Sequence, residues 1–275
     1  MKEIVQMKQI PSSEEEIPRI GLGTWQSFDK SPDHYKKLIE VLKYFYEYGG
    51  RVIDSSPMYG KAEKVVGDLI HQKDFPKAFL ATKIWIKRKQ EGIVQIQRSF
   101  EYFRVSKIDL FQIHNLVDWK LHIKTLRELK EKDKIKYIGI THYHTGAFSE
   151  LENVIKKEPI DFLQIPYSIE TIEAEKRLFS LCSEKKIAVI INRPFEGGEL
   201  FLKVKSKPIP INIQNLGCSS WADVFLKFIL ANKEVTCVIP ATSNPKHVVE
   251  NMKAGIGRTL TQIEKSEIFK TVYDM

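Results

Sequence analysis

The sequence predicts an α/β protein of the (β/α)8, or TIM barrel, class, forming a single domain over residues 1–275. Eight short apolar runs recur along the chain, and helical patterns lie between them. The runs are almost continuously hydrophobic, which is typical of parallel strands that are covered on their outer face. The chain of 275 residues is also close to the ~250 residues typical of such barrels.

The strands are expected where β-branched and apolar residues cluster between polar segments. In chain order the eight predicted strands are residues 19–22, 51–54, 78–83, 108–114, 136–141, 161–165, 187–192 and 236–240. Helices are expected between them wherever apolar residues recur every three or four positions. The residues that carry this pattern are Leu38, Ile39, Leu42 and Phe45 in 35–48, then Ile93, Ile96, Phe100 and Phe103, then Leu121, Thr125, Leu126 and Leu129, and most of 221–230.

A doubly wound open sheet is the main alternative to the barrel. Such a sheet would normally carry the pattern G-x-G-x-x-G directly after its first strand. Residues 21–26 read GLGTWQ, which lacks the third glycine and leads into a loop. The barrel is therefore preferred.

One long connection is expected after the seventh strand, over residues 193–219. It contains Gly197, Gly198, Pro208, Pro210 and Gly217, and it is far longer than a usual loop between a strand and a helix. A segment of this kind is either a functional lid or disordered.

Composition and charge exclude several classes of function. The net charge is +8, but no one-sided basic stripe with interleaved aromatics indicates a nucleic-acid partner. No apolar run approaches the ~20 residues of a membrane span, and residues 1–21 lack the apolar core of a signal peptide. Three cysteines without paired spacing fit reduced thiols. We expect a cytoplasmic monomer or weak oligomer that binds neither nucleic acid nor membrane.

Ionisable side chains gather where the predicted strands end, at the face where barrel enzymes place their active sites. Asp54 and Tyr59 follow the second strand, Lys83 ends the third and His114 ends the fourth. Four such groups from three consecutive strands should converge on one rim. The same ends also carry Trp25, Trp85, Asn115, Thr141, His142, Gln164 and Asn192.

The convergence indicates a general acid. A tyrosine titrates near 10 when unperturbed, and a neighbouring ammonium lowers its pKa by favouring the phenolate. We expect Lys83, kept charged by Asp54, to lower the pKa of Tyr59 so that the phenol can donate a proton, and His114 to orient a carbonyl oxygen. Each of these residues also has a purely structural explanation: Asp54 and Lys83 could form a structural ion pair, His114 could be a core imidazole and Tyr59 a turn residue. The presence of all four at successive strand ends favours catalysis.

A second signal lies in residues 238–255, which read VIPATSNPKHVVENMKAG. Ser243 or Asn244 can cap a helix that begins with Pro245. The free N–H groups of such a helix start can bind a phosphate, and Lys246 and His247 add positive charge. An ordinary capped helix would give the same pattern, but beside an acid catalyst it suits a dinucleotide that delivers a hydride.

Together these motifs resemble those of the aldo-keto reductases. The segments GLGTW, RVIDSSPMYG, LATKIW, LFQIHN, YIGITHY, LQIPYS and VIPATSNPKHVVEN occur in the order of that family and span nearly the whole chain. The resemblance implies a (β/α)8 barrel that binds NADPH, with NADH possible, and that reversibly reduces a small-molecule aldehyde or ketone to an alcohol. It implies no metal.

The resemblance also implies residue roles. Tyr59 would be the proton donor, Asp54 and Lys83 would set its pKa, and His114 would orient the carbonyl. The substrate pocket would be lined by Trp25, Tyr59, Trp85, His114 and Asn115. The cofactor would contact Gly23, Thr24, Trp25, Asp54, Thr141, His142, Gln164, Asn192, Arg193, Pro194, Phe195, Gly197, Ala241, Thr242, Ser243, Asn244, His247, Glu250 and Asn251. Of these, Gln164 would bind the nicotinamide carboxamide, and Ser243, Asn244, Glu250 and Asn251 the adenosine end.

Several positions depart from the family pattern. Thr141-His142 stands where many members have Ser-Asn, and Asn192-Arg193 stands where many stack a tyrosine on the nicotinamide. Ala241 and His247 occupy positions that are lysine and arginine in strongly NADPH-selective members. Charge still favours NADPH, because Lys246 lies beside His247.

Two other functions compete with carbonyl reduction. The first is a catalytically slow, reductase-like barrel that serves as a dinucleotide-binding regulatory or redox-sensing module. The second is a metallohydrolase that would use His142 and His144 with His114 and Asp54. The intact set of four catalytic residue types favours the reductase.

Overall fold

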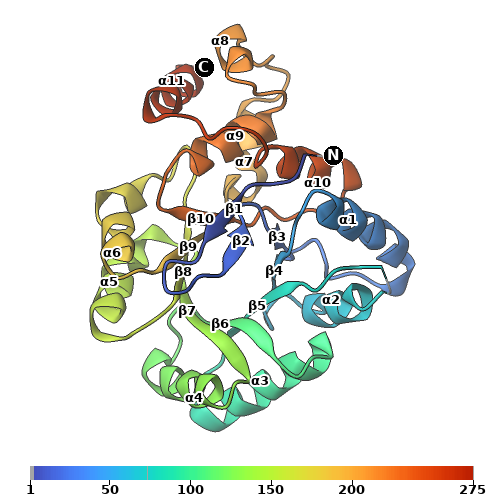
Figure 1. The fold of residues 1–275 in the computed structure, drawn as a ribbon, viewed down its shortest axis with the longest axis vertical. Helices are drawn as coiled ribbons and strands as arrows, with labels where there is room; N and C mark the ends of the chain where they lie inside the picture. The colour runs from blue at the N-terminus through green and yellow to red at the C-terminus, as the bar shows by residue number, and fades with distance from the viewer. Residues whose placement is uncertain (1–2, 73, 275) are drawn as a thin grey trace.

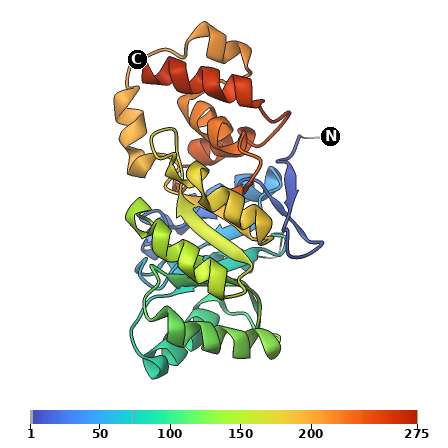
Figure 2. The ribbon, with the colours of Figure 1, turned by 90° about the vertical axis from the view of Figure 1, so that its left-hand side faces the viewer.

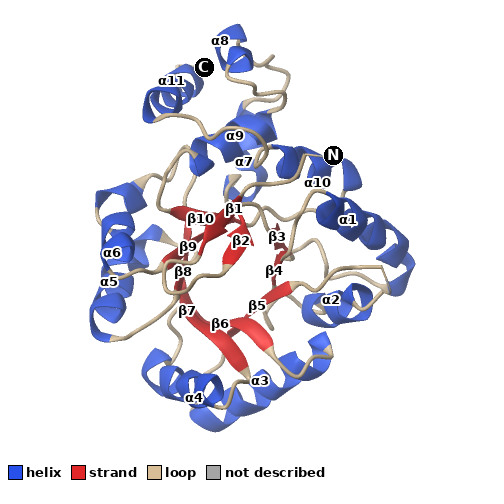
Figure 3. Cartoon of the chain, in the orientation of Figure 1, coloured by secondary structure: helices blue, strands red, loops and turns tan. Residues whose placement is uncertain are grey.

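The computed structural model describes residues 3–72 and 74–274, and it confirms the predicted barrel. Eight parallel strands lie in the order β10-β9-β8-β7-β6-β5-β4-β3 and curl into a ring that Figures 1 and 3 show end-on. The strands are β3 (Leu22–Gly23), β4 (Val52–Asp54), β5 (Phe79–Ile84), β6 (Ile108–His114), β7 (Ile135–Thr141), β8 (Phe162–Pro166), β9 (Ala188–Asn192) and β10 (Val235–Val238).

The ring is closed where its first and last strands meet. Two isolated bridges, Ile20 with Val238 and Gly23 with Ala241, join the two edges. Three backbone hydrogen bonds support them: Val238 N to Arg19 O, Gly21 N to Val238 O, and Gly23 N to Pro240 O. A Cβ on Gly23 would lie 2.8 Å from the carbonyl oxygen of Ile239, so a residue without a side chain is needed at this close approach.

Helices surround the strands, as expected for alternating β and α units. The longer ones are α1 (Tyr35–Glu47), α2 (Ala62–Ile70), α3 (Lys89–Phe103), α4 (Trp119–Glu131), α5 (Phe148–Lys157), α6 (Leu178–Glu184), α9 (Trp221–Leu230), α10 (Pro245–Lys253) and α11 (Gln262–Tyr273). The short ones are η1 (Pro32–His34), η2 (Thr145–Ala147), η3 (Glu173–Lys176), η4 (Glu196–Gly198), α7 (Glu199–Lys203) and α8 (Ile211–Asn215). In Figures 1 and 2, α8 and α11 lie side by side beyond the ring, and Asn212 of α8 donates to Glu267 and Thr271 of α11.

The two-residue period of each strand sorts its side chains between an inner and an outer face. Phe79, Leu110, Tyr137 and Phe162 belong to the apolar cluster inside the barrel. Polar residues follow on the same inner face, two or four positions further along these strands. They are Lys83, Gln112, His114, Thr141 and Gln164, and all are buried. The interior is therefore apolar at its N-terminal end and polar at its C-terminal end.

A short hairpin that the sequence analysis did not predict seals the apolar end. Strands β1 (Met7–Gln9) and β2 (Glu16–Pro18) pair antiparallel. Ile10 and Ile17 are buried in the same cluster as Val52, Phe79 and Leu110. The hairpin thus completes the core below the polar layer.

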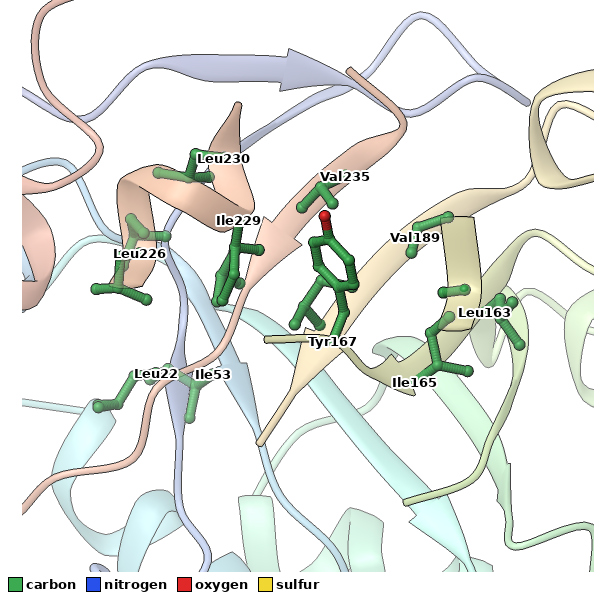
Figure 4. Close-up of a cluster of buried hydrophobic side chains, with 14 of the residues drawn as sticks. Leu22, Ile53, Leu163, Ile165, Tyr167, Val189, Leu226, Ile229, Leu230 and Val235 are labelled. Carbon is green, nitrogen blue, oxygen red and sulfur yellow. The ribbon is translucent and has the colours of Figure 1, made fainter. Parts of the chain in front are cut away.

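The outward side chains of the strands form a second, larger core against the helices. Figure 4 shows Tyr167 lying among Val189, Val235 and Ile165. Its ring lies 5.0 Å from that of Phe179 and 6.1 Å from that of Phe228, measured between centroids, and its hydroxyl donates to Glu175. With both faces buried, each strand reads as a continuous apolar run in the sequence.

Three expectations about the elements need correction. The first strand is Leu22–Gly23 rather than 19–22, because Leu22 and Gly23 are the residues that pair with β4, whereas Arg19 bonds with Gln6 and Val238 and Gly21 bonds with Val238. The last strand is Val235–Val238 rather than 236–240. Residues 193–219 are not a structureless loop, since they contain η4, α7 and α8. Among the described residues, no helix combines the length and the apolar character that crossing a membrane requires.

Candidate active site

A buried ion pair lies at the centre of the polar layer. Lys83 is fully buried on β5, and its Nζ lies 2.5 Å from Asp54 Oδ2 at the end of β4. The same ammonium donates to the carbonyl oxygen of Ser55 at 2.7 Å. Asp54 Oδ1 accepts from two carboxamides, Gln112 Nε2 at 3.1 Å and Gln164 Nε2 at 2.9 Å. Both charges are thus paired and hydrogen-bonded, as burial requires.

Tyr59 is held above this pair by the turn that follows β4. Its N–H donates to Ser56 O at 2.9 Å, and the next residue, Gly60, has a φ of +62° and lies against Asp29, which no larger residue could do without strain. Lys83 Nζ lies 5.2 Å from the centre of the Tyr59 ring. The structure therefore brings together Asp54, Tyr59 and Lys83, as the sequence predicted.

The electrostatics of the tyrosine differ from the prediction. Burial opposes the charge on Lys83, but Asp54 and Tyr59 outweigh it and raise the pKa of the lysine. Burial also raises the pKa of Tyr59; Lys83 lowers it and Asp54 raises it further. The prediction of a lowered tyrosine pKa was wrong in its net direction, because desolvation of the phenolate exceeds the attraction of the ammonium. Tyr59 is consequently protonated at neutral pH, the form that a proton donor needs.

His114 completes the group at the end of β6. Its ring is perpendicular to that of Tyr59 at 6.1 Å and lies 6.4 Å from that of Trp85, between centroids. Nδ1 lies 3.0 Å from Ser56 Oγ. Burial, with contributions from Lys83 and His142, lowers the pKa of His114 to about 2, so the imidazole is neutral. Asn115 and Leu116, which follow it, both have left-handed backbone conformations, which cost free energy and recur at active sites.

The predicted nicotinamide contacts form an arc at the ends of neighbouring strands. Thr24 Oγ1 donates to the backbone oxygen of Asp54 at 3.0 Å, and Thr141 Oγ1 donates to Gln164 Oε1 at 3.2 Å. The side chain of Asn192 donates to the carbonyl oxygen of His142 at 3.4 Å. Asn192 Oδ1 and Asn115 Oδ1 are buried and find no partner among the described residues. Unpaired buried acceptors at a rim suit a ligand that donates hydrogen bonds.

The predicted phosphate contacts lie at the start of α10. Asn244 is its N-cap and accepts from Lys246 N, with Pro245 in the first turn; this confirms the predicted cap. Lys246 and His247 are exposed, and His247 Nε2 lies 3.4 Å from Asn244 Nδ2. Ala241 and Glu250 are also exposed, Ser243 is half-buried, and Thr242 and Asn251 are buried. Of the residues proposed for the adenosine end, Ser243 and Asn244 therefore lie at the helix start, whereas Glu250 and Asn251 lie in its second half, with Asn251 on its inner face.

The segment after β9 is tied to the segment after β8. Glu196 accepts from Ser168 Oγ at 2.5 Å and from Thr171 Oγ1 at 2.7 Å. Arg193 has a left-handed backbone and lies 3.8 Å from Glu196. Pro194, Phe195 and Gly197 belong to the same turn, with Phe195 packed on Phe201. These contacts hold four predicted cofactor residues, Arg193, Pro194, Phe195 and Gly197, in an ordered turn beside β9.

The mouth of the barrel carries exposed apolar side chains. Trp25 and Trp85 are each 41% exposed, as expected of pocket-lining residues. Met58 and Tyr143, at 39% and 55%, are exposed after β4 and β7 and were not predicted. The described residues contain no group of three or more His, Cys, Asp or Glu side chains placed to hold a metal ion.

Two polar residues of the site were missed in the sequence. Gln112 supports Asp54, and Ser56 contacts His114. Gln112 stands two positions before His114, so the strand period could have placed it on the same inner face. Ser56 lies in a turn, where no periodicity reports which way a side chain points.

Comparison with known proteins assigns the family. A model described as "Aldo/keto reductase family" matches residues 19–270. The chain belongs to the aldo/keto reductase family. This membership makes the protein an oxidoreductase and agrees with the resemblance seen in its motifs.

Individual aldo/keto reductases are similar over most of the chain. "Probable aldo-keto reductase 1" of Glycine max is 27% identical, covering 94% of this chain and 86% of that protein. "9,11-endoperoxide prostaglandin H2 reductase" of Trypanosoma cruzi is 25% identical, covering 86% and 81%. A solved aldo-keto reductase of Klebsiella pneumoniae in complex with NADPH superposes with a TM-score of 0.81 at 19% identity, covering 99% of this chain and 96% of that one. That likeness is one of fold.

Proposed function

We propose that this protein is an NADPH-dependent reductase of small aldehydes or ketones, with Tyr59 as the proton donor. The observation that carries the proposal is the buried Asp54–Lys83 pair, with the ammonium 5.2 Å from the centre of the Tyr59 ring. Burying an ion pair costs desolvation free energy, and buried ionisable groups with perturbed pKa values cluster at functional sites. Beneath a phenol, the ammonium stabilises the anion that proton donation leaves behind.

Each side chain would then have a distinct role. When bound, NADPH would supply the hydride for the carbonyl carbon. As negative charge develops on the carbonyl oxygen, Tyr59 transfers its phenolic proton to that oxygen, and the alcohol is formed. Lys83 stabilises the resulting phenolate, while His114 donates a hydrogen bond that orients the same oxygen. Asp54, held by Gln112 and Gln164, keeps Lys83 charged and in place.

The residues of the rim fit a nicotinamide dinucleotide. Asn192 Oδ1, which is buried without a partner among the described residues, would accept from the nicotinamide carboxamide. The start of α10, with Lys246 and His247 exposed, would hold the 2′-phosphate that distinguishes NADPH from NADH. The NADPH and NADP complexes of two solved Klebsiella pneumoniae reductases support this choice, and NADH would bind more weakly.

Replacing Tyr59 with phenylalanine tests the proposal. The Tyr59→Phe variant should lose carbonyl reduction by about 10²-fold or more, because the proton donor is gone, while its affinity for NADPH changes little. Turnover is followed by nicotinamide absorbance with a panel of aldehydes, ketones and quinones, and affinity by fluorescence titration. Tyr273→Phe, on the far helix α11 and 81% exposed, is the matched control.

The result separates the candidate functions. Unchanged turnover in Tyr59→Phe would remove this residue from the acid role. Tight NADPH binding by the wild-type protein without turnover of any carbonyl in the panel would instead support the regulatory or redox-sensing module.

A further inference from the structure

Ser56 lies against the imidazole ring of His114. It lies two residues after Asp54, is fully buried, and places its Oγ 3.0 Å from His114 Nδ1. The same oxygen accepts a longer hydrogen bond, of 3.4 Å, from the N–H of Met58. The hydroxyl is therefore held in place by its own turn while it contacts the imidazole.

The direction of the Ser56–His114 hydrogen bond follows from the partners available. A serine hydroxyl has one proton to donate and two lone pairs to accept with. If the imidazole donated from Nδ1, the hydroxyl proton would need another acceptor, and within the described ranges no other group accepts from Ser56 Oγ. A buried donor without an acceptor is costly. The favoured arrangement has the hydroxyl donating to an unprotonated Nδ1.

The other ring nitrogen is then free for the substrate. His114 Nε2 makes no hydrogen bond with any described residue, and it is not one of the fully buried polar atoms that lack a partner. The ring lies beside Tyr59 and Trp85 at the barrel mouth. A neutral imidazole carries one proton only, so a proton excluded from Nδ1 must reside on Nε2.

We propose that Ser56 is a positioning residue that fixes His114 as the Nε2–H tautomer, so that Nε2 presents a hydrogen-bond donor to the substrate oxygen. The assignment of that oxygen rests on the function proposed above. The opposite tautomer would turn a lone pair toward the carbonyl oxygen and repel it. The position of the Ser56 hydroxyl, two residues beyond Asp54, thus decides whether His114 attracts or repels the substrate oxygen.

Nitrogen-15 NMR of the wild-type protein tests the tautomer without any assay of activity. In histidine-labelled protein the signals of His114 are assigned by their loss in His114→Gln. The proposal expects the proton on Nε2 and none on Nδ1 at neutral pH. A proton on Nδ1 in the wild-type protein would overturn it.

Two serine variants then test the cause. Ser56→Ala should allow the Nδ1–H form to appear, because the donor that excluded it is gone. Ser55→Ala removes a neighbouring buried hydroxyl whose partner is Thr24 rather than His114, and it should leave the tautomer unchanged. If Ser56→Ala keeps the wild-type tautomer, or if Ser55→Ala shifts it equally, Ser56 does not set the proton position.

Kinetics connect the tautomer to the reaction. Ser56→Ala should lower kcat for carbonyl reduction by about tenfold, the effect of losing one hydrogen bond of ordinary strength, and leave the dissociation constant of NADPH unchanged. An unchanged kcat in a variant whose tautomer has shifted would overturn the catalytic part of the inference. Absence of turnover in the wild-type protein would contradict the proposed function but not the tautomer assignment.

Discussion

At the scale of single residues, the site depends on one lysine. Lys83 gives hydrogen bonds to Asp54 and to the backbone of Ser55, and its remaining side faces Tyr59. Asp54 Oδ1, its second carboxylate oxygen, accepts hydrogen bonds from the side chains of Gln112 and Gln164. Removing either charge would leave the other buried and unpaired, which is the costly situation for an ion pair.

We expect Lys83→Met to lose both stability and activity. The free energy of unfolding should fall by about 3–5 kcal/mol, because Asp54 loses its counter-ion, and turnover should fall by about 10²-fold or more. Urea unfolding and nicotinamide absorbance measure the two effects. Lys203→Met, which breaks an exposed pair with Glu170, should lower the free energy of unfolding far less, because solvent screens exposed ion pairs. Equal losses in the two variants would contradict the special role of the buried pair.

A second buried carboxyl gives a pH-dependent prediction. Glu63 on α2 is buried and accepts from Thr82 Oγ1, and burial raises its pKa from 4.5 to about 6, against the hydrogen bonds of Thr82 and Ser99. A folded-state pKa above the unfolded value means that the protonated form stabilises the fold. That contribution is complete below pH 4.5 and is lost as the pH rises through about 6.

The variant Glu63→Gln isolates this effect. At pH values near 8 it should raise the free energy of unfolding by about 2 kcal/mol, the equivalent of the pKa shift, and the gain should vanish in acid. Glu40→Gln, on the exposed face of α1, should show no such pH-dependent gain. A stability difference that is constant with pH would contradict the assignment.

At the scale of elements, the ends of three strands and the start of one helix contribute different parts of the site. The ends of β4, β5 and β6 supply the ionisable group, whereas α10 supplies a capped N-terminus and two exposed basic side chains. A helix dipole and positive charge act together on an anion at such a start.

Cofactor preference should respond to that helix start. Replacing Lys246 and His247 together with alanine should weaken NADPH by about tenfold or more, equivalent to one charge-assisted hydrogen bond, and NADH much less. Fluorescence titration with each dinucleotide measures this. Lys253→Ala, at the other end of the same helix, controls for net charge. Equal weakening of both dinucleotides would place the phosphate elsewhere.

At the scale of the whole molecule, stability and chemistry are separated along the barrel axis. The β1–β2 hairpin and the apolar cluster seal one end, and the polar layer and the aromatic mouth occupy the other. This division is common in barrels of this architecture. Substitutions at the sealed end should therefore change stability without changing catalysis.

Ile10→Ala tests this separation. Truncating a fully buried side chain should lower the free energy of unfolding by about 2–5 kcal/mol, while KM and kcat of the folded enzyme remain as in the wild type. Ile4→Ala, at a position 57% exposed, should change stability by less than about 0.5 kcal/mol. A change in KM on Ile10→Ala would show that the two ends are coupled.

The sequence predicted the architecture well because the strands are buried on both faces. Continuous apolar runs such as 108–114 and 187–192 stand out from their surroundings, and their polar ends identified Asp54, Lys83 and His114. The hairpin was missed because its strands are three residues long.

The sequence could not predict how deeply a side chain is buried or which way a side chain in a turn points. The raised pKa of Tyr59 is a matter of burial, and no pattern of neighbours reports how deeply a turn residue lies. The partnership of Ser56 with His114 depends on how a turn folds back across two strands. The placement of Gln112 could have been derived from His114 by the strand period.

The closure of the ring has a mechanical consequence. Its edges are held together by three peptide hydrogen bonds around Gly21, Gly23 and Val238, whereas β6 and β7 share a long ladder. Local opening of a fold begins where the fewest hydrogen bonds hold it, so the barrel should open first between β3 and β10. The amide protons of Gly21 and Gly23 should therefore exchange with solvent before those of β6. A cofactor that spans this junction from Thr24 to Asn244 would slow their exchange.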